Sequence, residues 1–303
     1  MIEGTTIGSY PKIYNIGHRA VREIFNEAIL IEEKIDGSQF SFGIRNGQIL
    51  CRSHKKQIVV DAPDKMFELA VESVKSRAHL LQEGWVYRGE YLQKPKHNSL
   101  AYDRVPKGNI MLFDICPGME DYLLYNNKQA EAHRLGLETV PRIDVGRVQS
   151  KDDILGLLTQ VSVLGGQAIE GVVVKNYERF GVDGKVLMAK HVSEAFKEVH
   201  RQTWGASNPT SKDIVTRVGD ALRTTARWNK AIQHLREDGT LVEGPQDIGP
   251  LIKEIKRDVE EECVDEIKDM LYKWALSSVL RSSTKGFPEW YKEKLLDKQF
   301  EEE

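Results

Sequence analysis

Seven short segments before residue 205 alternate between apolar and polar side chains or are almost wholly apolar. Gly, Pro and Asn, which favour turns, stand between them. Alternation along the chain is the pattern of a strand with one buried face, so these segments predict an antiparallel or mixed sheet. They are Ile29–Glu33, Gln39–Ile44, Gln48–Cys51, Trp85–Leu92, Asn109–Ile115, Ala168–Asn176 and Lys185–Val192.

Helical periodicity occurs in the same part of the chain. Apolar residues recur at about one-turn spacing in His18–Asn26, Pro63–Leu81 and Ile154–Leu164, which predicts three helices. The combination of strands and helices indicates an α+β fold for this part.

The strand pattern stops after Trp204. Gly205–Ser211 has the composition of a linker that ends in a helix cap, and we place a domain boundary there. The chain is therefore expected to hold one domain of residues 1–204 and a helical domain of residues 205–303. The helices expected beyond the boundary are Lys212 to about Leu235, Ile248 or Pro250 to Leu280, and a short one after Pro288.

The charge balance does not identify a partner. The chain of 303 residues carries 43 basic and 46 acidic side chains, a net charge of -3, so a nucleic acid would need a local basic patch. The expected helix after the boundary is the most basic segment. Cations one turn apart could follow a phosphate backbone, although such runs are usually solvated faces. These cations are Lys212, Arg217, Arg223, Arg227, Lys230 and Arg236.

Several protein classes are excluded by what the sequence lacks. Its apolar runs are far shorter than the ~20 residues of a membrane span, and no basic start is followed by an apolar leader. The three cysteines are isolated and lack CxxC spacing, which argues against a disulfide framework and a zinc cluster. A cytoplasmic protein without a membrane partner is expected.

The sharpest local signal is the segment Glu33-Lys34-Ile35-Asp36-Gly37, which places a lysine just before an expected tight turn. Taken alone, such a lysine is most often a solvated turn residue. As a nucleophile it would need surroundings that lower the pKa of its amine.

An ordered set of residues follows this lysine: Arg52 in Cys-Arg-Ser-His, Glu90 in Arg-Gly-Glu-Tyr, Phe113 in Leu-Phe-Asp-Ile, Glu170 in Glu-Gly-Val-Val-Val-Lys175, and Lys190 in Met-Ala-Lys. With this set the chain resembles the covalent nucleotidyltransferase superfamily of ATP-dependent DNA and RNA ligases and messenger RNA capping enzymes. Five collinear motifs recur in the family's order.

Within the superfamily, Glu-Lys-Ile-Asp-Gly-Ser-Gln-Phe is most similar to the RNA ligase 2-like group. The resemblance implies antiparallel sheets of the nucleotidyltransferase (ATP-grasp-like) type with flanking helices, followed by a small all-helical C-terminal domain. DNA ligases and capping enzymes carry a β-barrel OB domain there instead, and the strand-poor C-terminal third does not match one.

The resemblance implies catalytic roles for Lys34, Asp36, Glu90, Glu170 and Lys190. Lys34 would attack the α-phosphate of ATP, release pyrophosphate and form a lysyl-AMP. AMP would then pass to an RNA 5′-phosphate, and a 3′-hydroxyl would displace it. Lys190 and bound Mg²⁺ are expected to lower the pKa of Lys34.

The carboxylates Asp36, Glu90 and Glu170 would hold Mg²⁺, with Mn²⁺ as an alternative, because hard cations prefer oxygen ligands. Their simpler interpretation is a set of exposed salt bridges at strand ends.

Further residues are implied to bind the nucleotide. Phe113 would stack on adenine, although its alternation with Met111 and Ile115 also fits ordinary core packing. Arg52 would contact a phosphate of AMP or of the RNA end, or it is a surface arginine. A regular strand would place Lys175 on the face opposite Glu170, so we rank it below Lys190. The remaining candidates are Glu33, Ile35, Gly37 and Gln39.

Two positions depart from the family pattern. The last motif usually has two lysines separated by one residue, and here Met188 stands where the first is expected. Either Lys185 or Lys175 replaces that cation, or adenylylation is weaker or differently balanced between the steps of the reaction. Gln39 stands where the related phage enzymes usually have asparagine, and its extra methylene moves the amide.

These features predict an ATP-dependent RNA ligase that joins 3′-OH and 5′-phosphate ends, in nicked duplex RNA, in RNA repair. A separate kinase or phosphatase would prepare the ends. A compact DNA ligase or RNA/DNA-hybrid ligase is the alternative within the enzyme class. A non-catalytic RNA-binding protein with a ligase fold is the alternative outside it, because of Met188.

Overall fold

The computed structural model describes residues 6–26, 28–98, 100–118, 121–143, 148, 150–181, 184–193 and 213–301. The chain divides into two compact units. The first unit is Met1–Val199 with Thr224–Ile255, and the second is His200–Arg223 with Lys256–Glu303. Residues 224–255 therefore pack with the strand-rich part of the chain. The linker Gly205–Ser211 and its cap lie outside the described residues.

The first sheet of the first unit has four strands in the order β1-β10-β9-β2. β2 (Leu30–Lys34), β9 (Gly171–Phe180) and β10 (Val186–Val192) pair antiparallel, while the short β1 (Tyr14–Asn15) runs parallel to β10. One face is a core of aliphatic side chains. It includes Ile31, Val172, Val174, Leu187 and Ala189.

The second sheet has six strands in the order β5-β4-β3-β6-β7-β8. Its core face is rich in aromatic residues, which suit a pleated and buried surface. Phe40, Phe42, Tyr87 and Tyr91 are fully buried there. The strands are β3 (Ser38–Arg45), β4 (Gln48–Ser53), β5 (Gln57–Ile58), β6 (Val86–Tyr91), β7 (Ile110–Cys116) and β8 (Glu138–Thr139).

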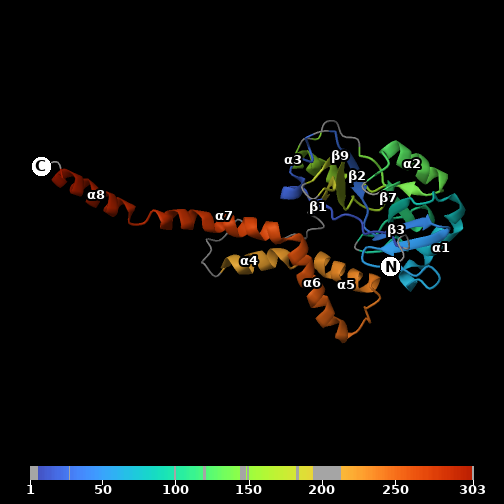
Figure 1. Ribbon diagram of the computed structural model, residues 1–303. Coiled ribbons are helices and arrows are strands. Elements are labelled where there is room, and N and C mark those ends of the chain that lie inside the picture. Colours follow the sequence, from blue (N-terminus) through green and yellow to red (C-terminus); the bar gives the residue numbers. More distant parts are fainter. Residues whose placement is uncertain are drawn as a thin grey trace. The chain divides into compact units, whose positions relative to one another are not determined.

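Short helices flank the two sheets (Figure 1). α1 (Glu68–Arg77) and α2 (Tyr125–Arg134) lie beside the six-stranded sheet, and α3 (Lys151–Leu155) lies beside the four-stranded one. α5 (Thr225–Glu237) is the last complete α-helix of this unit. The 3₁₀ turns are η1 (Arg19–Val21), η2 (Lys65–Phe67), η3 (Ala78–Leu80), η4 (Lys107–Asn109), η5 (Gly156–Thr159) and η7 (Pro245–Asp247).

All seven predicted strands are present, and the α+β class is confirmed. Two helix predictions were wrong in extent. His18–Asn26 holds only η1, and Val21 in this turn and Ile24 after it are buried. The helix expected at Ile154–Leu164 ends instead at Leu155 and continues only as η5.

The second unit is helical. It contains α4 (Asp213–Leu222), α7 (Val264–Ser283) and α8 (Phe287–Glu301), and it shares α6 (Ile248–Glu262) with the first unit. No helix among the described residues is long and apolar enough to cross a membrane.

Two long helices predicted for this region are each divided. Thr224 breaks the first, because its extended backbone and side-chain cap on the Arg227 amide start a new helix, α5. Cys263 breaks the second, with φ -113° and ψ 0° between α6 and α7. Of the basic residues of the predicted first helix, Arg217 therefore lies on α4, whereas Arg227, Lys230 and Arg236 lie on α5, which belongs to the other unit. Arg223 lies between the two helices, and Lys212 lies outside the described residues.

Candidate active site

Lys34 is the last residue of β2, and its ammonium group faces a carboxylate. Its Nζ lies 2.7 Å from Oε2 of Glu170, which directly precedes β9. The Lys34 side chain is 26% exposed, so its amine can be reached. Burial lowers the pKa of Lys34, but the nearby carboxylates outweigh this and raise the pKa above its ordinary value. The amine therefore becomes a nucleophile only where added positive charge offsets these carboxylates.

Three carboxylates act on Lys34, and they come from three different parts of the chain: Asp36, Glu90 and Glu170. Burial, together with the neighbouring carboxylates and against the effect of Lys34, raises the pKa of Glu90 to about 8. Burial also raises the pKa of Glu170, while Lys34 and Lys190 oppose the shift. Such crowding of buried acids around one amine is typical of a functional site rather than of exposed salt bridges.

The turn after Lys34 joins the two sheets, and its polar groups are hydrogen-bonded. The amide of Asp36 donates to the Tyr102 hydroxyl at 2.8 Å, and its carboxylate accepts the Leu100 amide at 2.8 Å. The amide of Gly37 donates to Oε1 of Glu90 at 3.1 Å, and the Gly37 carbonyl accepts from the Asn98 amide at 2.6 Å. These bonds fix the Asp36 and Glu90 carboxylates at the lysine-bearing turn.

Gly37 is required here by close approach. A Cβ at this position would lie 2.6 Å from the Tyr91 carbonyl oxygen and 2.7 Å from Cγ of Glu90. We expect Gly37→Ala to slow transfer of AMP to the protein by about 10²-fold, because a shift of about 1 Å in a catalytic group costs that much. The measurement is the initial rate of labelling by ATP labelled at its α-phosphate. Gly156→Ala is the control, since a Cβ there meets nothing within 4 Å. Equal labelling rates for Gly37→Ala and wild type would contradict the steric requirement.

Lys190 shares a face of the four-stranded sheet with Lys34. Pairing places Lys190 opposite Val173 and Met188 opposite Lys175, while Glu32 of β2 also pairs with Val173. Residues directly opposite in an antiparallel pair lie on the same face. Glu170 lies just outside the regular strand, so strand alternation does not separate it from this face.

Lys175 does not provide a free cation in place of the residue missing at Met188. Its side chain is 1% exposed, and Nζ lies 2.8 Å from Glu32 and 3.0 Å from Asp114. Met188 itself is buried, with its sulfur 3.0 Å from the Tyr10 hydroxyl. The Met188 departure thus removes a charge that Lys175 does not restore.

Phe113 contacts both the apolar core and a buried ionic cluster formed by Glu32, Asp114, Lys128 and Lys175. Its carbonyl accepts from Nζ of Lys128 and of Lys175, each at 2.7 Å. Its half-buried ring packs edge-on against Tyr10, with centroids 5.1 Å apart. The ring also contacts both the apolar cluster of Ile35 and that of Met188. The polar contacts of its backbone fix the position of Phe113. This position is compatible both with stacking on adenine and with ordinary core packing.

Arg52 and Gln39 lie on the face of the six-stranded sheet that carries Glu90. Gln39 pairs with Glu90 across β3 and β6, and its Oε1 lies 3.1 Å from Nδ1 of His54. Arg52 donates through Nη2 to the Lys55 carbonyl at 3.2 Å. Arg52 Nε and Gln39 Nε2 are buried without a hydrogen-bond partner, which leaves two donors for a ligand.

The side chains of Glu33 and Ile35 point away from the lysine. Glu33 accepts from the Ser162 hydroxyl at 2.5 Å and from the Val163 amide at 3.0 Å. Ile35 is 3% exposed and belongs to an apolar cluster. Alternation along β2 explains the orientation of Glu33, and Ile35 directly follows the strand, so these two residues shape the site through their backbone and packing.

Sequence reasoning missed several residues that the structure brings to the site. Glu32, Asp114 and Lys128 form the buried ionic cluster with Lys175. Asp114 directly follows Phe113, and this adjacency is the sequence signal that could have indicated Asp114 as a site residue. Gln233 and Glu237 of α5 contact the lysine-bearing turn, and no local pattern indicated this.

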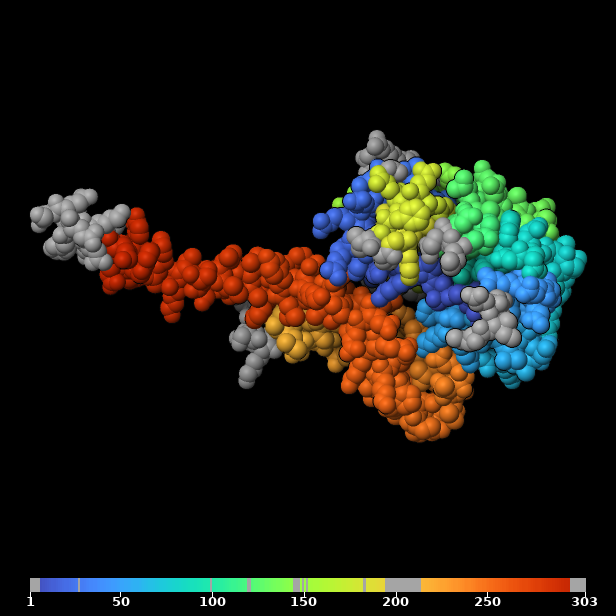
Figure 2. Space-filling model, viewed as in Figure 1, coloured from blue at the N-terminus to red at the C-terminus, as the bar shows by residue number. Residues whose placement is uncertain are grey.

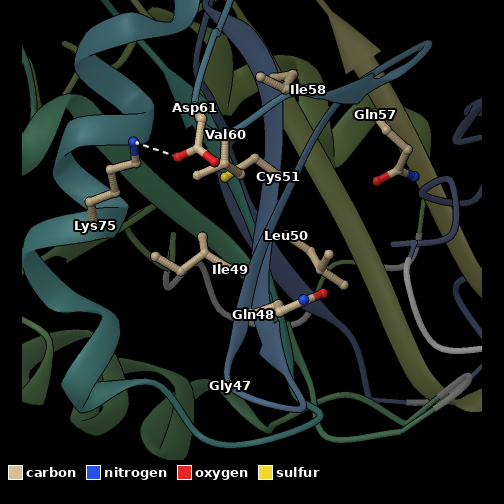
Figure 3. A pocket seen from close by; sticks show the side chains of 10 residues that line it. All are labelled: Gly47, Gln48, Ile49, Leu50, Cys51, Gln57, Ile58, Val60, Asp61 and Lys75. Atoms are coloured by element: carbon tan, nitrogen blue, oxygen red, sulfur yellow. Dashed lines mark hydrogen bonds and ion pairs between the residues drawn. The ribbon is translucent and has the colours of Figure 1, made fainter.

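A cavity of about 500 Å³ lies elsewhere in the first unit, against β4, β5 and α1 (Figure 3). Ile49, Leu50 and Val60 line it, and Lys75 faces Asp61 at 3.5 Å across it. None of the predicted site residues lines this cavity.

The family model for RNA ligase matches residues 27–192. The structure of Naegleria gruberi RNA ligase with PPi is 19% identical to this chain, with a TM-score of 0.50 over 66% of this chain and 62% of that chain. An apo structure of a point mutant of the same enzyme has the same identity, coverage and TM-score.

The chain thus spans about three-fifths of the length of these solved structures, which share its fold. No curated protein sequence matches the chain significantly. The matched segment is more than half of the chain and contains Lys34, Glu90, Glu170 and Lys190, and the chain therefore belongs to the RNA ligase family.

Proposed function

We propose that the protein is an ATP-dependent RNA ligase that acts through a lysyl-AMP on Lys34. The observation that carries the proposal is the reachable Lys34 amine, 2.7 Å from Glu170 and under the influence of Glu90 and Asp36. The ammonium group first loses a proton, and the amine then attacks the α-phosphorus: the N–P bond forms, the bond to pyrophosphate breaks, and the nitrogen releases a second proton to the solvent. AMP then passes to an RNA 5′-phosphate, and a 3′-hydroxyl displaces AMP as the phosphodiester forms.

The acidic residues of the site fit a divalent cation. Among the described residues, no three His, Cys, Asp or Glu side chains are grouped closely enough to hold a metal ion by themselves. Mg²⁺ commonly binds through one or two carboxylates and completes its shell with phosphate and water oxygens. Glu90 and Glu170, with Asp36, would hold it. When bound, the cation neutralises phosphate charge.

The protein's own residues supply positioning and charge. Lys190, which also opposes the raised pKa of Glu170, offers a cation beside the phosphates. The unpartnered Nε of Arg52 offers a donor to a phosphate of AMP or of the RNA end. Phe113 offers an aromatic face to adenine.

Nicked duplex RNA is the proposed substrate, in RNA repair, with a separate kinase or phosphatase preparing the ends. We expect the protein to seal nicks with RNA on the 3′-OH strand faster than matched nicks with DNA there, because the 2′-hydroxyl is the available discriminator. Side-by-side sealing rates on the two nicked duplexes measure this. Equal or faster sealing of the all-DNA nick would favour a compact DNA or hybrid ligase instead.

One observation favours a second candidate, a non-catalytic RNA-binding protein. Met188 is buried against Tyr10, so the position where relatives carry a phosphate-binding lysine is apolar here. Duplex RNA binding without covalent labelling by ATP would support that candidate.

A further inference from the structure

Helix α5 contacts the turn that follows Lys34. It lies in the same compact unit as the two sheets, although almost two hundred residues of chain separate it from that turn. Figure 2 shows this segment, in orange, against the blue surface of the first part of the chain. The contacts come from two residues spaced four apart on one face of the helix, Gln233 and Glu237.

Both residues bond to the turn itself. Oε1 of Glu237 accepts from the Ser38 hydroxyl at 2.6 Å. Nε2 of Gln233 donates to the Gly37 carbonyl at 3.0 Å and to Oε1 of Glu237 at 2.7 Å. Glu237 is 4% exposed, so these bonds are shielded from water and held in a fixed geometry.

The hydrogen bonds around Ser38 run in one direction, toward Glu237. The Gln93 amide donates to Nδ1 of His97 at 3.0 Å, so the neutral ring carries its proton on Nε2. That nitrogen lies 2.9 Å from Oγ of Ser38 and donates to it. Ser38 in turn donates to Glu237. His97 and Ser38 thus donate in sequence toward the buried Glu237 carboxylate, which orients the serine hydroxyl.

A second set of contacts fixes the end of α5 to the loop after β4. Nζ of Lys55 lies 2.7 Å from Asp238 and 3.5 Å from Glu254, and Nζ of Lys56 donates to the Asp238 carbonyl at 3.0 Å. His234 bonds to Glu254 at 2.5 Å. This second anchor holds α5 without touching the lysine-bearing turn, so the two sets of contacts can be tested separately.

We propose that Glu237 and Gln233 are positioning residues for the ligase reaction: they hold Gly37 and Ser38 so that Lys34 is aimed at the α-phosphate. This rests on the proposed function. It makes residues 224–255 part of the adenylylation machinery rather than an appendage that acts only on RNA.

The test compares adenylylation by wild type, Glu237→Ala, Gln233→Ala and Glu237→Gln. Glutamine keeps an acceptor for Ser38, so Glu237→Gln is expected to retain the wild-type rate within about threefold. Glu237→Ala is expected to lower kcat for lysyl-AMP formation by about 10-fold or more, with KM for ATP changed by less than about threefold. Gln233→Ala is expected to have a smaller effect of the same kind, because Asn98 still bonds to the Gly37 carbonyl.

Two controls separate positioning from folding. Lys55→Ala removes the ion pairs of the second anchor with Asp238 and Glu254, and Arg236→Ala changes an exposed residue of α5. The positioning role is supported if Lys55→Ala has the same melting temperature as Glu237→Ala but retains the kcat of wild type. If kcat falls equally in both, or if Glu237→Gln is as impaired as Glu237→Ala, the inference is overturned.

The wild-type arm distinguishes this inference from the proposed function. Absence of any labelling in wild type would overturn the ligase chemistry. Labelling in wild type and equally in Glu237→Ala would overturn only the role of α5.

Discussion

Replacing Lys34 with alanine is expected to abolish covalent labelling by ATP that carries its label in the α-phosphate, a loss of at least about 10³-fold. Effects of this size are usual when the attacking nucleophile is removed. Lys175 cannot substitute, because its ammonium group is buried between Glu32 and Asp114.

The labelling experiment needs a folding control and a lysine control. Lys34→Ala leaves Glu170 without its 2.7 Å partner, so its melting temperature is recorded beside its activity. Lys75→Ala removes only an exposed ion pair with Asp61 and should label like wild type. Undiminished labelling of a folded Lys34→Ala protein would refute the assigned nucleophile.

Replacing Asp114 with alanine is expected to lower the free energy of unfolding by about 3–5 kcal/mol, the usual cost of breaking a buried ionic group. Asp114 is fully buried, lies 3.0 Å from Lys175, and also accepts from the hydroxyls of Tyr10 and Tyr177. Its loss leaves the cluster with excess buried positive charge. Denaturant unfolding at neutral pH measures the difference, and Asp61→Ala is the matched surface control, since the Asp61 side chain is 96% exposed.

The effect of Asp114 should depend on pH in a defined direction. Burial raises the pKa of Asp114, but Lys175, Lys128 and the two tyrosine hydroxyls lower it below the ordinary value of 3.8. A carboxyl with a depressed pKa in the folded state contributes stability above its unfolded pKa. The contribution is lost as the pH falls through the folded pKa. The gap between wild type and Asp114→Ala should therefore shrink below about pH 4, and a pH-independent gap would contradict this.

The strands could be predicted because their apolar alternation is local and strong. Phe40 and Phe42 lie on one face of β3, while Gln39 and Ser41 lie on the other, as the alternation in the sequence indicates. The helices of the C-terminal third were harder to delimit. Thr224 and Cys263 each interrupt a segment with continuous helical periodicity. A helix break depends on the backbone dihedral angles, which the spacing of apolar residues does not predict.

The site divides in a similar way. Lys34, Glu90 and Glu170 are brought together as the motif order predicts. The roles of Glu33 and Lys175 could not be inferred, because their partners Ser162 and Glu32 lie on distant strands or loops. The contact of Glu237 with Ser38 could not be predicted from the sequence either, because it depends on how α5 packs against the sheets.

The central claim is that AMP becomes attached to Nζ of Lys34. The most direct measurement is to incubate the protein with ATP and Mg²⁺, digest it, and locate the AMP-bearing peptide by mass spectrometry. We expect AMP on Lys34 alone, and its release when nicked duplex RNA is added to the intact adenylylated protein. AMP on Lys190 or another residue, or a folded protein that carries none, would contradict the account.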